Sequence, residues 1–309
     1  MIDAATRLLR PPAWAAALPP NAQGMLLMIA AVSGFAGMTA ALKYVSQELP
    51  FLVVILVRMA FGIVPLLPWI ARNGIGTLRT HRFPLHVARA LNGYLALACF
   101  VYALTQLSLA DVTAIGFARP LWVIVIAALF LGETVGWRRG TATVVGFLGV
   151  LVILRPGGHL DPAMLVALLG SFGACMTLIL IKMLSTTEPG GRIVFYHQGL
   201  SFLIGLAPAV WFWETPTPTQ CVWIAVSAFC GTFGHLCFAR ACKLAEATVI
   251  APMEYTRLVA ATALGFALFG ELPSIWVVPG TALIAGASLY IARREARLKA
   301  AGATGKAVL

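Results

Sequence analysis

Ten apolar runs follow one another along the 309-residue chain, separated by short polar or turn-rich breaks. Most are close to the roughly 20 residues that a helix needs to cross the hydrocarbon core of a bilayer. The pattern therefore predicts an all-α integral membrane protein of ten transmembrane helices, with short loops and no separate soluble domain. The runs cover residues 23–43, 50–71, 87–107, 111–131, 139–154, 162–183, 193–213, 220–241, 247–269 and 274–292.

The composition supports this prediction. Apolar residues make up 60% of the chain and charged residues 11%, whereas a soluble domain has roughly 45–50% and about 25%. The net charge of +11 would suggest nucleic-acid binding in a soluble protein. In a membrane protein the same excess is expected of cytoplasmic loops, so we expect lipid and a small solute as partners, and no nucleic acid.

The distribution of basic residues predicts the orientation. If the N-terminus is cytoplasmic and the ten runs alternate, 17 of the 22 Lys and Arg residues fall on the cytoplasmic side and two on the other. The remaining three, Arg58, Arg119 and Arg257, lie within apolar runs. Such an asymmetry follows the positive-inside rule. We therefore expect a multi-pass protein of the cell (inner or plasma) membrane with both termini in the cytoplasm.

The two halves of the chain share short patterns in the same order. Gly140-Thr141-Ala142 recurs as Gly280-Thr281-Ala282, and Gly132-Glu133 recurs as Gly270-Glu271. Five helices are an odd number, so the second copy would enter the membrane inverted. Inverted repeats are typical of secondary transporters, whose substrate site lies near the midplane between the repeats. No phosphate-binding loop is present in the sequence.

Short motifs in both halves point to a family. They are Tyr102-Ala103-Leu104, Leu109-Ala110-Asp111-Val112-Thr113, Pro120, Leu131-Gly132-Glu133, Gly146-x-x-Gly149-Val150, Ala245-Glu246-Ala247-Thr248, Glu254-Tyr255-Thr256-Arg257 and Phe269-Gly270-Glu271. With these motifs the chain resembles the EamA-type transporters of the drug/metabolite transporter superfamily over about residues 22–292. The resemblance implies two inverted five-helix EamA-like repeats, cytoplasmic termini and a central cavity. Arg155-Pro156-Gly157 and Glu254-Tyr255-Thr256-Arg257 also resemble the branch of S-adenosylmethionine uptake carriers.

These observations divide the chain into four segments. Residues 1–21 are expected to form a cytoplasmic tail without a cleaved leader, and residues 293–309 a basic cytoplasmic tail. Residues 22–155 would form the first repeat, with the first five helices. Residues 156–292 would form the second repeat.

Charged residues inside the apolar runs are the first candidates for a binding site. A charge at the centre of a spanning helix costs about 2.5–3.5 kcal/mol, so it usually faces a cavity or a partner. Glu254 and Arg257 would share one helix face and form an ion pair, or Glu254 would meet a substrate cation or a proton. Arg119 precedes Pro120, which would interrupt its helix, and Pro252 has a comparable place in the ninth run. Arg119 could neutralise Glu254 or bind an anionic group, and Arg58 could be structural or part of the site.

Polar and aromatic side chains at a similar depth complete the candidate set. They suit an organic solute, although packing between helices would explain each of them as well. His197 and His235 have no third ligand at a suitable spacing, so we expect no metal site, no cofactor and no catalytic residue. The residues are Asn92, Tyr94, Tyr102, Trp122, Tyr196, His197, Gln198, His235 and Tyr255.

Acidic residues at the ends of two runs call for a separate explanation. Asp111 and Glu246 open the fourth and ninth runs, where a carboxylate complements the helix dipole. Glu133 and Glu271 follow the same two runs, where the dipole disfavours a negative charge, and the sequence offers no account of them.

The sequence as a whole predicts a secondary transporter of a small organic metabolite, such as an amino acid, a nucleotide derivative or an S-adenosylmethionine-like solute. Transport would use alternating access with proton coupling or exchange. The alternatives are an intramembrane lipid-modifying enzyme and a membrane subunit without transport activity. The sequence leaves the solute, the direction of transport and the oligomeric state open.

Overall fold

The computed structural model describes residues 18–130, 137–154, 161–245 and 253–300. All regular structure in these ranges is helical. The longest elements are α3 (Pro20–Ser46), α6 (Phe83–Gln106), α10 (Pro162–Ser185), α11 (Gly190–Trp211), α12 (Pro218–Leu244) and α15 (Val277–Ala300). The shorter elements are α4 (Phe51–Ile63), η1 (Val64–Leu66), α5 (Leu67–Asn73), η2 (Ile75–Leu78), α7 (Leu109–Gly116), α8 (Arg119–Phe130), α9 (Trp137–Leu154) and α14 (Thr256–Phe269).

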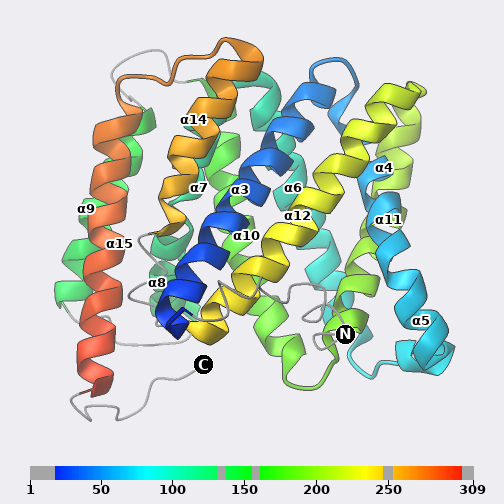
Figure 1. The fold of residues 1–309 in the computed structure, drawn as a ribbon, viewed down its shortest axis with the longest axis horizontal. Helices are drawn as coiled ribbons and strands as arrows, with labels where there is room; N and C mark the ends of the chain where they lie inside the picture. Colours follow the sequence, from blue (N-terminus) through cyan, green and yellow to red (C-terminus); the bar gives the residue numbers. More distant parts are fainter. Residues whose placement is uncertain (1–17, 131–136, 155–160, 246–252, 301–309) are drawn as a thin grey trace.

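Each of the ten apolar runs contains an apolar helix. Six helices or joined helices are long and apolar enough to cross a membrane, and four shorter ones are also apolar. The structure therefore confirms an all-helical membrane protein. The helices stand side by side in one bundle, and α3 begins at the same end of the bundle at which α15 ends (Figure 1).

Helix packing follows the two halves of the sequence. The helix α3 packs along α12, and α6 packs along α10. In the two halves of the sequence α3 corresponds to α10, and α6 corresponds to α12. If each helix is replaced by its counterpart, one of these pairs becomes the other. Three further pairs, α9 with α15, α4 with α11 and α7 with α14, join each helix to its own counterpart. The contacts of α6 with α11 and of α3 with α14 are matched in the same way by those of α12 with α4 and of α10 with α7. The contact pattern therefore has the symmetry of an internal repeat.

Glycines allow the closest of these contacts. A Cβ atom added to Gly34 would lie 2.9 Å from the carbonyl oxygen of Cys230, so α3 and α12 meet backbone to backbone. Gly173 occupies the corresponding place between α10 and α6, where an added Cβ atom would lie 2.9 Å from Cβ of Ala96. Small residues favour such close crossings in membranes, where association depends on van der Waals packing.

Two interruptions shape the middle of the bundle. The fourth run is divided between α7 and α8 by a turn at Phe117 and Ala118, directly before Arg119 and Pro120. This confirms the expected interruption. In the ninth run Tyr255 is a turn residue and α14 starts at Thr256. The backbone therefore changes course beside several of the candidate side chains.

Candidate functional site

Arg58 lies where α4 meets α3 and α12. Its Nη2 atom donates a hydrogen bond to the sulfur of Met38 at 3.6 Å, and a Cβ atom added to Gly231 would lie 3.3 Å from it. His235 lies on α12 and packs edge-on against Phe35, with ring centroids 4.9 Å apart. Although His235 is exposed, Arg58 acts on it electrostatically. An accessible imidazole among arginines indicates a polar interior, because lipid disfavours such groups.

A second group of candidates lies between α6 and α11. His197 is held in place by Ser201, whose hydroxyl lies 3.2 Å from Nδ1 of the imidazole, and by close contact with Gly93. Gln198 packs against Gly62 of α4. Tyr94 is 5% exposed and packs against α11. Polar groups from α4, α6 and α11 therefore face one another across these helices.

Arg89 joins this group, although the sequence assigns it to the cytoplasmic charges. It lies two turns into α6 and is 6% exposed. It acts electrostatically on both His197 and His235. The signal in the sequence was its position inside the apolar run that starts at residue 87.

A third group lies around the interruption of the ninth run. Tyr255 packs edge-on against Phe117, with centroids 4.9 Å apart. Arg257 lies 5.5 Å above the same ring in a cation–π contact. Arg257 also interacts electrostatically with Arg119 and with Glu254. Residues from both halves of the chain therefore meet here.

The interpretation of Glu254 and Arg257 as an ion pair on one helix face is wrong. Within the described residues they form no ion pair shorter than 4.0 Å, although the carboxylate acts on the guanidinium at longer range. The guanidinium of Arg257 instead lies over the ring of Phe117, 5.5 Å from its centroid. Pro252, the expected cause of an interruption here, lies outside the described residues.

Two other candidates make contacts that hold helices together. The side-chain amide of Asn92 donates hydrogen bonds to the carbonyl of Gly173 at 2.8 Å and to Thr177 at 2.7 Å. The indole nitrogen of Trp122 donates to Ser171 at 2.9 Å. Both attach the first half of the chain to α10.

The charge of these groups is unbalanced. Arg58, Arg89, Arg119 and Arg257 lie within the apolar helices, and Glu254, directly before α14, is the carboxylate that interacts electrostatically with one of them, Arg257. The Nε atoms of Arg58, Arg89 and Arg119 have no hydrogen-bond partner in this part of the chain. Unpaired charge in a membrane is costly, so the arrangement favours an acidic group from outside.

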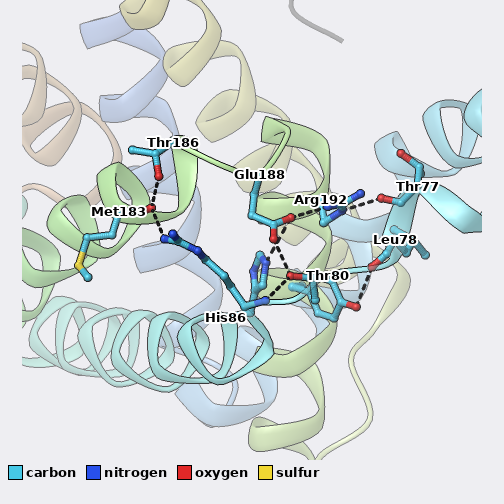
Figure 2. Close-up of polar contacts among 10 residues, drawn as sticks. Thr77, Leu78, Thr80, His86, Met183, Thr186, Glu188 and Arg192 are labelled. Atoms are coloured by element: carbon cyan, nitrogen blue, oxygen red, sulfur yellow. Dashed lines mark hydrogen bonds and ion pairs between the residues drawn. The ribbon is translucent and has the colours of Figure 1, made fainter.

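A polar network closes the bundle at the end where α3 begins (Figure 2). The carboxylate of Glu188 accepts hydrogen bonds from Thr80 and from Arg192, both at 2.6 Å. Burial raises the pKa of Glu188, but these hydrogen bonds and the charges of Arg192 and His86 outweigh it and keep that pKa below its ordinary value. Arg192 also donates to the carbonyl of Thr77 at 2.6 Å. The network ties the segment before α6 to the start of α11.

The opposite end carries a buried ion pair between Lys43 of α3 and Glu271, which follows α14. The sequence assigns Lys43 to the outer loops, but it is 2% exposed. Asp111, which opens the fourth apolar run, lies in the first turn of α7 as predicted, and Ser108 provides the N-cap. Glu133 and Glu246 lie outside the described residues. In the part of the chain that the structure describes, no group of three or more metal-ligating His, Cys, Asp or Glu side chains occurs.

The sequence was compared with family models. The model of the EamA-like transporter family matches residues 22–155 and again residues 161–293. The chain belongs to this family. The two matches correspond to the two halves that the helix packing relates to each other.

Curated relatives of the chain are transporters by name. It is 29% identical to the S-adenosylmethionine uptake transporter of Rickettsia prowazekii over 82% of this chain and 86% of that protein. It is 30% identical to the riboflavin transporter of Brucella anthropi over 87% of this chain and 98% of that protein. It is 27% identical to the pseudopaline exporter CntI of Pseudomonas aeruginosa over 88% of this chain and 96% of that protein.

The fold is also known from experiment. A solved crystal structure covers 88% of this chain, and the chain covers 98% of it, with a TM-score of 0.58 at 18% sequence identity. The family, the fold and the named relatives together show a drug/metabolite transporter superfamily member with lipid and small-molecule partners. They also support the expectation that the protein is not an enzyme.

Proposed function

We propose that the protein is a secondary carrier with ten transmembrane helices and two cytoplasmic termini, which moves a small organic metabolite by alternating access. The observation that carries the proposal is the meeting of charged side chains from both halves. Arg58 and Arg89 act on His197, and Arg119 interacts with Arg257. A site at the interface of inverted repeats can be exposed to either side when the repeats move against each other.

The solute would lie among the charged and aromatic groups of the three clusters. Arg58, Arg119, His197, His235 and Arg257 would bind its polar parts. Tyr94, Gln198, Tyr255 and Glu254 would complete the site, while Asn92 and Trp122 would act by positioning α10. Relatives are named for S-adenosylmethionine, riboflavin and pseudopaline, and we propose a solute of this size with both ring and acidic or amino groups.

Glu254 is our candidate for coupling transport to a proton gradient or to exchange. It lies directly before α14 and acts electrostatically on both Tyr255 and Arg257. Carboxylates inside transporters are common members of proton pathways.

A ligand-stabilisation screen on purified protein tests the proposal. Amino acids, nucleotides, S-adenosylmethionine and riboflavin are added in turn, and a ligand of the folded state raises the melting temperature. We expect at least one solute to do so, and expect Arg119→Gln to abolish its effect. Arg72→Gln, at an exposed position of α5, is the matched control. A solute that stabilises Arg119→Gln as much as the wild type would contradict the site.

A further inference from the structure

Two arginines in the first half of the chain, Arg89, which is buried, and Arg58, which is partly buried, lack the partners that such groups normally have. Arg89 is 6% exposed, and its Nε and Nη1 atoms have no hydrogen-bond partner within the described residues. The Nε atom of Arg58 likewise has none. The hydrogen bond that Arg58 donates goes to the sulfur of Met38, which is a weak acceptor. Several strong donors are therefore available.

These donors belong to one region between α4, α6 and α11. Arg58 and Arg89 both act electrostatically on His197, the one from α4 and the other from α6. The neighbouring Gln198 and Tyr94 also bear buried polar atoms, Oε1 and the phenolic oxygen, that lack a hydrogen-bond partner among the described residues. Unsatisfied polar atoms on three helices that pack together indicate a place that a polar ligand completes.

Neither arginine is neutralised. Across residues 18–130, 137–154, 161–245 and 253–300, no carboxylate forms an ion pair with Arg58 or Arg89. Glu188, before α11, is bonded to Thr80 and Arg192, as Figure 2 shows. A buried charge without a partner is strongly unfavourable, so binding an anion would stabilise these arginines.

The imidazole of His197, on which both arginines act, is positioned by contacts with α6 and with its own helix. Ser201 lies 3.2 Å from its Nδ1 atom and 3.2 Å from the carbonyl of Ala90, and Gly93 leaves room for the ring at close range. Rigid positioning of polar groups is what a specific binding site requires.

We propose that Arg89 and Arg58 form an anion-binding subsite between α4, α6 and α11, which binds a carboxylate or phosphate group of the transported solute. The inference rests on the proposed transport function and specifies its substrate class. Guanidinium groups suit these anions because their planar donors match two oxygens at once. Arg89 is then a specificity-determining residue, and the cluster around Arg257 and Tyr255 is left for the remainder of the solute.

Matched pairs of probes that differ by one acidic group test the subsite. One pair is S-adenosylmethionine and its decarboxylated analogue, and the other is riboflavin 5′-phosphate and riboflavin. Binding to the purified full-length protein is measured by titration calorimetry. We expect the acidic member of at least one pair to bind at least about tenfold more tightly, as the loss of a charge-assisted hydrogen bond implies. Arg89→Gln should abolish the preference, and Arg72→Gln should retain it.

Two further variants protect the test against misfolding. Arg89→Lys keeps the charge and should keep a weaker preference, while Arg58→Gln should reduce it independently of Arg89. The proposal is overturned if both members of each pair bind equally to the wild type, if neither acidic member binds, or if Arg89→Gln keeps the preference. Saturable flux of a neutral solute in liposomes would then leave the transport function standing, so the two failures can be told apart.

Discussion

Lys43 and Glu271 form a buried ion pair that joins two distant parts of the chain. Lys43 also donates a hydrogen bond to the carbonyl of Leu107 at 2.6 Å, and Glu271 accepts one from the backbone N–H of Leu109 at 3.0 Å. The pair therefore connects α3, the start of α7 and the segment after α14. The dipole of α14 alone would disfavour a negative charge at Glu271. This cost is offset because Glu271 lies at the N-terminus of α7, where the dipole of that helix favours a carboxylate.

Breaking this pair on one side should destabilise the protein. We expect Glu271→Gln to lower the free energy of unfolding by about 3 kcal/mol, because it leaves the buried Lys43 without its partner. Lys43→Met leaves the partly exposed Glu271 and should cost less. The measurement is thermal unfolding in detergent.

A double variant separates the pair from its parts. Lys43→Met combined with Glu271→Leu removes both charges and should cost less than the two single losses added together. Lys182→Gln, at an exposed position of α10, is the control and should change little. Single variants as stable as this control would show that the pair contributes nothing.

The network around Glu188 predicts a dependence of stability on pH. The pKa of this carboxyl is held below its ordinary value, so the stabilisation it provides is complete above that ordinary value. It is lost as the pH falls through the ordinary value towards the lowered one. Melting temperatures at pH 7 and pH 4 should therefore differ more in the wild type than in Glu188→Gln.

The same variant should also be less stable at neutral pH. Losing the charge weakens the hydrogen bonds from Thr80 and Arg192, and we expect a cost of about 1–3 kcal/mol. An identical pH dependence in Glu188→Gln and in the wild type would assign the effect to other carboxylates.

Close crossing of α3 and α12 makes Gly34 sensitive to substitution. An added Cβ atom would lie 2.9 Å from the carbonyl oxygen of Cys230, which is backbone and cannot move aside easily. We expect Gly34→Ala to cost about 1–3 kcal/mol. Gly199, in α11, has no neighbour within 4 Å of such an atom, so Gly199→Ala should be neutral or slightly stabilising. Equal melting temperatures for the two variants would contradict the crossing.

Glu254 should matter for coupling more than for folding. It forms no ion pair shorter than 4.0 Å with another described residue, so Glu254→Gln should retain the wild-type melting temperature within a few degrees. If Glu254 carries the coupling proton, uphill accumulation of solute in vesicles should fall at least about tenfold, while exchange of internal for external solute continues. Normal accumulation by a well-folded variant would assign coupling elsewhere.

Hydrophobic runs predicted the helices well because membrane helices must satisfy their backbone hydrogen bonds internally and face lipid. The turn at Tyr255 was not predicted. Since Pro252 suggested only an interruption somewhere nearby, the spacing from Glu254 to Arg257 was interpreted as regular helix. Local sequence does not determine where a helix is interrupted when neighbouring helices provide the compensating contacts.

The hydrogen-bond partners of the site residues could not be predicted from the sequence for a different reason. Asn92 bonds to Thr177 and Trp122 to Ser171, which are contacts between helices far apart in the chain. Arg89 was counted with the cytoplasmic charges near the end of an apolar run, whereas burial depends on which helices surround that end. Charge and periodicity thus indicate which residues are unusual, and packing determines what each of them contacts.

Counterflow in liposomes containing only this purified protein tests the central claim most directly. Vesicles loaded with a solute identified by the stabilisation screen are diluted into a trace of the same labelled solute. The account predicts saturable uptake of the label that is accelerated by the internal solute and lost in Arg119→Gln, but not in Arg72→Gln. Uptake that is absent, or unsaturable and equal to that of empty liposomes, would contradict a carrier that alternates between the two sides of the membrane.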